Sequence, residues 1–151
     1  MIPTAEILDA LQSTIDATGL FDRVTRHSSA DLPEALEALR DPAPKLCFII
    51  PGTDTWDHVL LEDRNIPQSA TLKSEVTLLI TAHDATHTRS GSDTAYPLKD
   101  HLQAALCWDN LSIPNLLTLP QTCEPMRIEW DDAPARTAWQ LTLEIRQTLT
   151  A

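Results

Sequence analysis

The chain has 151 residues, of which 42% are hydrophobic and 22% charged, and these values fit one globular domain. Its net charge of −11 disfavours non-specific binding to nucleic acid or to an anionic membrane, although DNA could still pass such a surface without adhering. No apolar run approaches the about 18 residues of a membrane span, and the acidic N-terminal stretch lacks the basic segment of a signal peptide. Three cysteines without a CxxC pair favour a reduced, cytosolic chain.

The first third of the chain predicts two helices and a short edge strand. Apolar side chains at helical spacing place a helix over residues 4–18, with Thr4 as its cap and Gly19 at its end. Residues 24–26 are expected to form the short edge strand. A second, short helix is predicted over residues 31–40, because an Asp and a Glu there have the spacing of a capping box.

The next stretch predicts three strands. Residues 45–50 are almost continuously apolar, as in a central strand that is buried on both faces. Residues 51–54 contain Pro and Gly and predict a turn, after which residues 56–61 form a weaker strand. Residues 72–82 alternate between apolar and polar side chains and predict a strong strand.

The second half begins with residues 83–94, which carry almost no apolar side chain and predict a long exposed loop. A third helix is predicted over residues 96–108. Two short strands follow, over residues 116–119 and 126–130. The final strand, over residues 138–149, alternates most regularly, so that one of its faces meets a core and the other meets water or a partner.

Together these elements predict one α+β domain over residues 1–151. Hairpin-like spacings dominate, so the sheet is expected to be mostly antiparallel, with the helices packed on one of its faces.

His83, Asp84 and His87 form the cluster that comes nearest to a metal site. Neutral imidazoles and carboxylates are good ligands for zinc or iron. The two histidines would lie together on a helix, but here they follow a strand and precede a Ser/Gly-rich loop. We therefore expect no metal, no cofactor and no catalytic residue. A small metal-dependent enzyme built on this cluster stays as an alternative.

Four tryptophans are expected to anchor the core or an interface. A Trp that is only partly buried in the monomer is common at subunit contacts. Trp56, Trp108 and Trp130 are therefore our candidates for an interface between subunits.

The order of elements resembles that of the Mu-like prophage tail-terminator proteins and, more loosely, the wider tail-terminator and tail-completion group of long-tailed phages. The resemblance is carried by an alternating strand over 76–82, the polar Arg89-Ser90-Gly91 segment and a helix that contains Tyr96 and Leu102 and ends at Trp108. Asn110, Leu111, Pro114 and a long last strand follow. It covers most of the chain and is sharpest over residues 96–114.

The resemblance implies a structural protein rather than an enzyme. Such proteins form a ring, commonly a hexamer, that caps the tail tube and contacts the head connector, while DNA passes without specific binding. The protein would lie in the host cytoplasm during assembly and then in the virion tail. The loop would be the contact arm, through six residues: His87, Arg89, Ser90, Gly91, Ser92 and Asp93. A third possibility, a small cytosolic binding module, also remains open.

Overall fold

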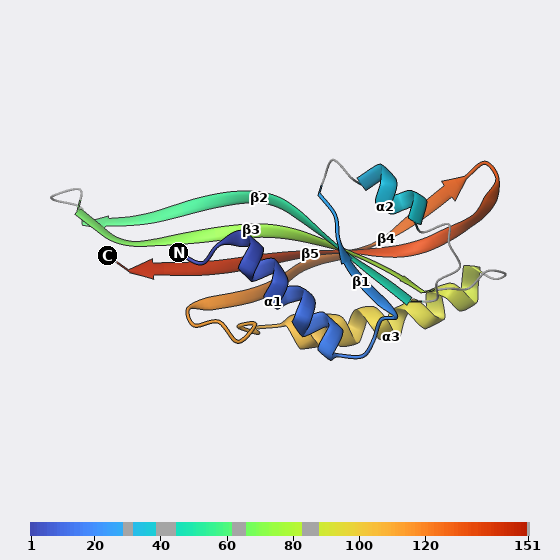
Figure 1. Ribbon diagram of the computed structural model, residues 1–151, viewed down its shortest axis with the longest axis horizontal. Helices are drawn as coiled ribbons and strands as arrows, with labels where there is room; N and C mark the ends of the chain where they lie inside the picture. Colours follow the sequence, from blue (N-terminus) through green and yellow to red (C-terminus); the bar gives the residue numbers. More distant parts are fainter. Residues whose placement is uncertain (29–31, 39–44, 62–65, 83–87, 151) are drawn as a thin grey trace.

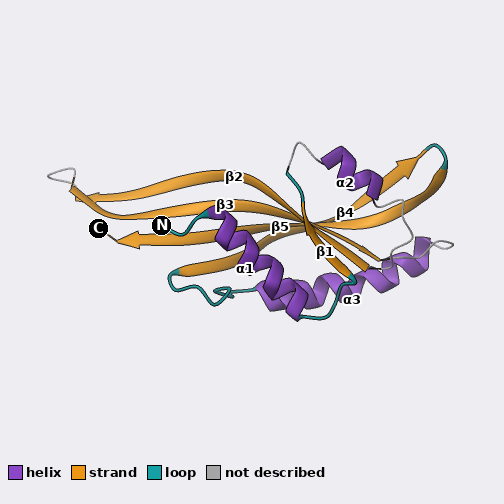
Figure 2. Cartoon of the chain, in the orientation of Figure 1, coloured by secondary structure: helices purple, strands orange, loops and turns teal. Residues whose placement is uncertain are grey.

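The computed structural model describes residues 1–28, 32–38, 45–61, 66–82 and 88–150 (Figure 1). This part of the chain holds three helices, α1 (Thr4–Ala17), α2 (Leu32–Ala38) and α3 (Thr88–Leu106). Its strands are β1 (Arg23–Arg26), β2 (Lys45–Leu61), β3 (Ile66–Ala82), β4 (Leu116–Trp130) and β5 (Ala133–Thr150). The strands form one sheet in the order β1-β2-β3-β5-β4, and four of them are 15 to 18 residues long (Figure 2).

The predicted fold class, α+β with helices on one face, is wrong. The fold is mostly β and its sheet is mixed. The sheet is mixed because β1 runs parallel to β2, whereas the other three strand pairs are antiparallel. Helices also contact both faces: α1 and α3 contribute to the core on one face, whereas Leu36 of α2 packs against a cluster on the other.

The larger core cluster covers what we call the helix face of the sheet. Ile7, Leu11 and Ile15 of α1 and three leucines of α3 pack there against the strands. β5 turns alternate side chains, from Trp139 to Gln147, into this layer, where all of them are buried. The alternation predicted for the final strand is therefore confirmed.

The opposite face, which we call the open face, is apolar only at one end. A second cluster there contains Phe48, Leu79 and Ile128, with Leu36, Met126 and Trp130 packed against it. Further along the strands the same face carries polar side chains, which the next section describes. The sheet therefore has a helix face with a mostly apolar core and an open face that changes from apolar to polar along its length.

Two of the predicted breaks are not breaks in the structure. β2 is continuous through residues 51–54, where we predicted a turn, and a register shift between Pro51 and Asp54 accommodates one extra residue. Gly52 suits this position, because a Cβ atom there would lie 3.1 Å from the carbonyl oxygen of Glu75. β4 likewise joins the two short strands predicted at 116–119 and 126–130 into one strand with two register shifts.

α3 begins at Thr88, eight residues before its predicted start, and Pro97 lies inside it. The prediction of a loop over residues 83–94 is therefore wrong for residues 88–94, and residues 83–87 lie outside the described residues. α1 also differs in detail, since Pro3 is its N-cap and no side chain caps it. The positive φ of Gly19, 67°, fits the predicted end of this helix.

Candidate interaction surface

β2 and β3 extend past the helices as a long hairpin (Figure 1). We call residues 53–61 and 66–73 the distal hairpin. Every residue of β2 from Gly52 to Leu60 is exposed, and the set includes Trp56 at 41%, Val59 at 53% and Leu60 at 46%. Large apolar side chains that stay in water on a strand are a feature of contact surfaces rather than of a closed core.

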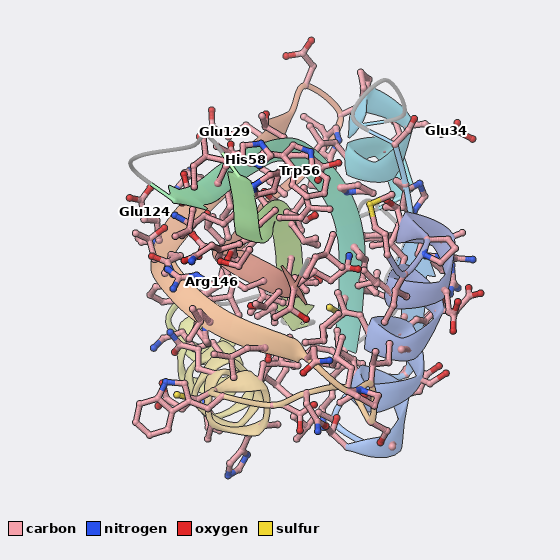
Figure 3. All side chains as sticks on the ribbon, turned by 90° about the vertical axis from the view of Figure 1, so that its left-hand side faces the viewer. Glu34, Trp56, His58, Glu124, Glu129 and Arg146 are labelled. Carbon is pink, nitrogen blue, oxygen red and sulfur yellow. The ribbon has the colours of Figure 1, made fainter. Side chains whose placement is uncertain are left out.

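Trp56 and His58 lie on the helix face of the distal hairpin. Trp56 pairs with Leu72 across the sheet, and Leu72 points to the same side as the core residues of β3. The indole and the imidazole stack, with ring centroids 6.0 Å apart and an angle of 9° between their planes. Figure 3 looks along the sheet from this end and shows the two rings as neighbours. The stack holds Trp56 in one orientation while 41% of the residue remains exposed.

The outer edge of β2 is paired over only part of its length. β1 pairs with residues 46–49, and the amide of His27 donates to the carbonyl of Ile49 over 2.9 Å. Beyond Pro51, no strand within the described ranges lies along this edge. We call residues 54–60 the distal edge. An unpaired edge presents backbone donors and acceptors to a strand from another chain.

The other edge of the sheet, β4, is built differently. Pro120 and Pro125 lack amide protons, and register shifts interrupt the strand after Pro120 and after Ile128. The amide of Thr118 donates to Asp109 over 2.8 Å, and its carbonyl accepts from Trp108 over 2.9 Å. These features hinder pairing of β4 with a further strand, whereas residues 54–59 of β2 form a regular stretch between two register shifts and contain no proline.

The open face carries charged side chains in rows across neighbouring strands. Glu75 lies directly opposite Glu144, and Lys73 lies directly opposite Arg146. Ion pairs connect these rows to opposite charges, because Arg146 contacts Glu144 and Lys73 contacts Asp57. The Lys73 ammonium donates a hydrogen bond to Asp57, and this bond and its charge lower the pKa of that carboxyl.

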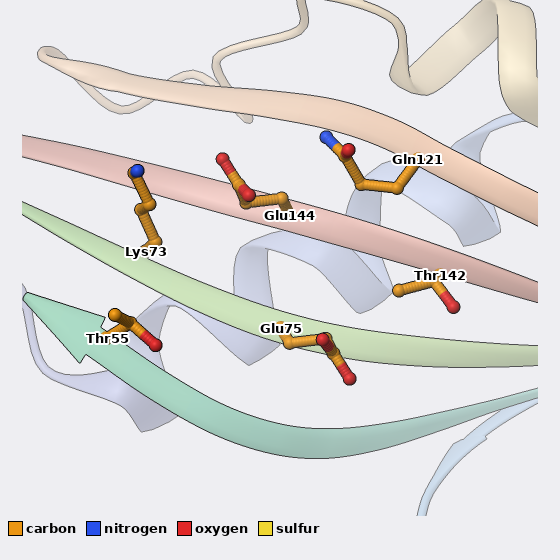
Figure 4. Close-up of a pocket in the computed structure, with 6 residues that line it drawn as sticks. All are labelled: Thr55, Lys73, Glu75, Gln121, Thr142 and Glu144. Carbon is orange, nitrogen blue, oxygen red and sulfur yellow. The ribbon is translucent and has the colours of Figure 1, made fainter.

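Between these rows lies a shallow depression of about 160 Å³. Its lining side chains come from four strands and all project from the open face (Figure 4): Thr55, Lys73, Glu75, Gln121, Thr142 and Glu144. Such a small and open site offers little apolar surface for a drug-sized ligand. Its polar side chains suit a solvated or interfacial surface.

Trp108 is a second exposed tryptophan, with 76% of the residue exposed. It follows α3 in the left-handed conformation, with φ 58°, and its amide donates to Thr118 over 2.9 Å. Asp109 accepts a further bond from the amide of Leu111 over 2.8 Å. These bonds fix the turn, so Trp108 is presented on a well-defined support. We call residues 107–112 the Trp108 turn.

The structure does not bring the three candidate interface tryptophans together. Trp56 lies on β2, Trp108 follows α3, and Trp130 at the end of β4 is half-buried against the cluster under α2. The arm residues Arg89, Ser90, Gly91, Ser92 and Asp93 lie in the first turns of α3 rather than in a loop. His87 lies outside the described residues, as do His83 and Asp84.

Sequence reasoning missed the distal edge, because it read residues 51–54 as a turn and so predicted two short strands. The signal that was available is the exposed apolar content of residues 56–60, which is unusual for a strand without a covering layer.

Within the described ranges no group of three or more His, Cys, Asp or Glu side chains is arranged to hold a metal ion. The cysteines lack the setting of a nucleophile: burial raises the pKa of the Cys47 thiol far above its usual range and also raises that of Cys123. Cys107 is exposed.

No family model matches the chain, and no curated protein matches it. Among the described helices, none is long and apolar enough to cross a membrane.

Proposed function

We propose that this protein is a non-enzymatic assembly subunit of a phage or prophage tail, and that it closes the tail tube as a homo-oligomeric ring. The observation that carries the proposal is the pair of exposed anchors on different elements, Trp56 on the distal hairpin and Trp108 on its turn. A ring needs a heterologous interface, which joins two different patches of neighbouring subunits. These two anchors are candidates for such patches.

The chemistry of the surface also favours an assembly role. Partly exposed tryptophans on defined supports are the residues that most often dominate protein interfaces. The net charge of −11 would keep DNA from adhering to the wall of a ring while it passes through. The remaining partners in this proposal are the tail tube and the head connector, which the subunit would meet in the host cytoplasm and keep in the virion.

The proposal is tested by native mass and particle shape at several protein concentrations, using light scattering and negative-stain images. We expect rings with a central hole that grow in population as concentration rises. Trp108→Ala should reduce the ring population at least tenfold, because interface tryptophans contribute about 2 kcal/mol or more. Met126→Ala, a half-buried change at the other end of β4 against the cluster under α2, serves as a control and should leave the rings intact. Particles that stay monomeric at every concentration would contradict the proposal.

A further inference from the structure

The distal edge of β2 has a defined set of backbone groups that point outward. In the first half of the strand the carbonyls of Lys45 and Ile49 accept hydrogen bonds at the outer edge from the amides of Asp22 and His27, each over 2.9 Å. The odd-numbered residues there therefore turn their backbone amide and carbonyl groups outward. The extra residue between Pro51 and Asp54 reverses this alternation, so that beyond it the even-numbered residues turn their backbone groups outward. Asp54, Trp56 and His58 therefore turn their amide and carbonyl groups toward the open edge.

The side chains of this edge alternate between the two faces of the sheet. Trp56 and His58 lie on the helix face, and Thr55 and Asp57 lie on the open face, where Asp57 contacts Lys73. Asp54 lies on the same face as Trp56, since residues two apart on a strand share a face. From residue 54 to residue 59 the register with β3 is regular, so this alternation is unbroken.

We propose that the distal edge pairs, antiparallel, with the same edge of a second copy of this chain, with Trp56 of each copy opposite the other. In this register Asp54 of each copy lies opposite His58 of the other, and Thr55 lies opposite Asp57. The outward amide and carbonyl groups of the two strands then lie opposite each other and can form the hydrogen bonds of an antiparallel pair. The two indoles form an aromatic pair, and each imidazole N–H and threonine hydroxyl donates to a carboxylate across the contact.

The sequence of the edge favours this register and this occupant. If the centre moved one residue to Asp57, two carboxylates would lie opposite each other, which is destabilising. If it moved to His58, Asp57 would lie opposite Val59. The β4 edge is a poor partner, because Pro120 and Pro125 lack the amide protons of a ladder. The paired stretch also stops short of Ile49, where β1 occupies the edge.

This contact is isologous and closes after two copies, so it differs from the ring of the proposed function and does not depend on it. It uses the distal hairpin, which means that the dimer has to open before a ring contact through the same hairpin can form. The free protein would thereby keep its unpaired edge covered.

The register is tested by disulfide trapping in a Cys107→Ser/Cys123→Ser background. Thr55→Cys and Asp57→Cys are made as separate proteins, because residues 55 and 57 of the two copies would lie directly opposite each other. We expect a covalent dimer when the two proteins are mixed under mild oxidation, and at least tenfold less from either protein alone. Linkage of Asp57→Cys to itself, or no linkage in the mixture, would overturn the register.

Sedimentation equilibrium of the otherwise unchanged chain completes the test. Trp56→Ala should weaken the dimer at least tenfold, whereas Trp108→Ala should leave it unchanged, and circular dichroism verifies that both fold. An equal effect of both changes would overturn the proposal. Disulfide-trapped dimers without rings would support this inference and contradict the proposed function. Rings without disulfide-trapped dimers would support the proposed function and contradict this inference.

Discussion

The two halves of β2 belong to one strand and both pair with β3, but one half is buried and the other is exposed. In the first half, residues 46–50 are buried on both faces and are covered by helices. In the second half, residues 52–60 are exposed, although the ladder to β3 continues with the same direction of pairing. The comparison shows that strand pairing alone can extend a strand well beyond its core, and that the extension is then available for contact with another molecule.

The largest expected effect comes from a deletion in the core. Leu141→Ala removes a fully buried side chain from the middle of β5 and should lower the free energy of unfolding by about 3 kcal/mol, through lost burial and a residual cavity. Leu60→Ala in the distal hairpin should change it by less than about 0.5 kcal/mol. Urea denaturation measures both. A similar loss for the two variants would mean that the distal hairpin belongs to the core.

The bulge that separates the two halves should be sensitive to any side chain. Gly52→Asn should cost about 1–2 kcal/mol of unfolding free energy, because its Cβ would lie 3.1 Å from the carbonyl oxygen of Glu75. Gly19→Asn is the control, since that site has a positive φ with no atom within 4 Å, and Asn tolerates this conformation. Thermal denaturation compares them. If Gly19→Asn were the more damaging change, the steric account of the bulge would be wrong.

The ion pair of the distal hairpin predicts a pH dependence. Lys73 lowers the pKa of Asp57 in the folded state, so the pair stabilises the fold at pH values above the unfolded pKa of about 4. This contribution is lost as the pH falls through the lower, folded pKa. A double-mutant cycle of Asp57→Asn and Lys73→Met should therefore show a favourable coupling at pH 7 and none at pH 2. A coupling that persists at pH 2 would contradict the assigned cause.

The smallest expected effect concerns the two carboxylates of Glu75 and Glu144, which lie opposite each other on the open face. Glu75→Gln removes one of two carboxylates that lie opposite each other and should raise the free energy of unfolding by about 0.5 kcal/mol. Glu129→Gln at the edge strand removes a carboxylate that contacts Arg127 and should give no gain. Chemical denaturation at low salt resolves the difference. A lower free energy of unfolding in Glu75→Gln would mean that Glu75 and Glu144 do not repel each other enough to destabilise the fold.

The sequence predicted those parts of the fold that are governed by burial. The alternation of β5, the apolar run at residues 45–50 and the stripe of α1 all mark residues that meet a core, and each lies where expected. The continuity of β2 through Pro51 and Gly52 was not predictable in the same way. Local signals there favour a turn, and the pairing with β3, a distant contact, overrides them.

The candidate site was harder to predict than the core. Trp56 and Trp108 were selected because Trp is common at contacts, and both are exposed, but Trp130 is half-buried and the three lie on separate elements. The arm was placed in a loop because residues 88–94 lack apolar side chains, yet they extend α3. Polarity alone does not separate a loop from an exposed helical turn, since helical hydrogen bonds need no apolar side chain.

Hydrogen exchange along β2, followed by mass spectrometry over a range of protein concentrations, tests most directly whether its second half is a contact surface. We predict that amides in residues 46–50 exchange slowly at every concentration. The outward amides of Asp54, Trp56 and His58 should exchange rapidly in dilute protein and become protected as the protein associates, because a second strand covers them. Rapid exchange of these three amides at every concentration, in protein shown to be associated, would contradict the account.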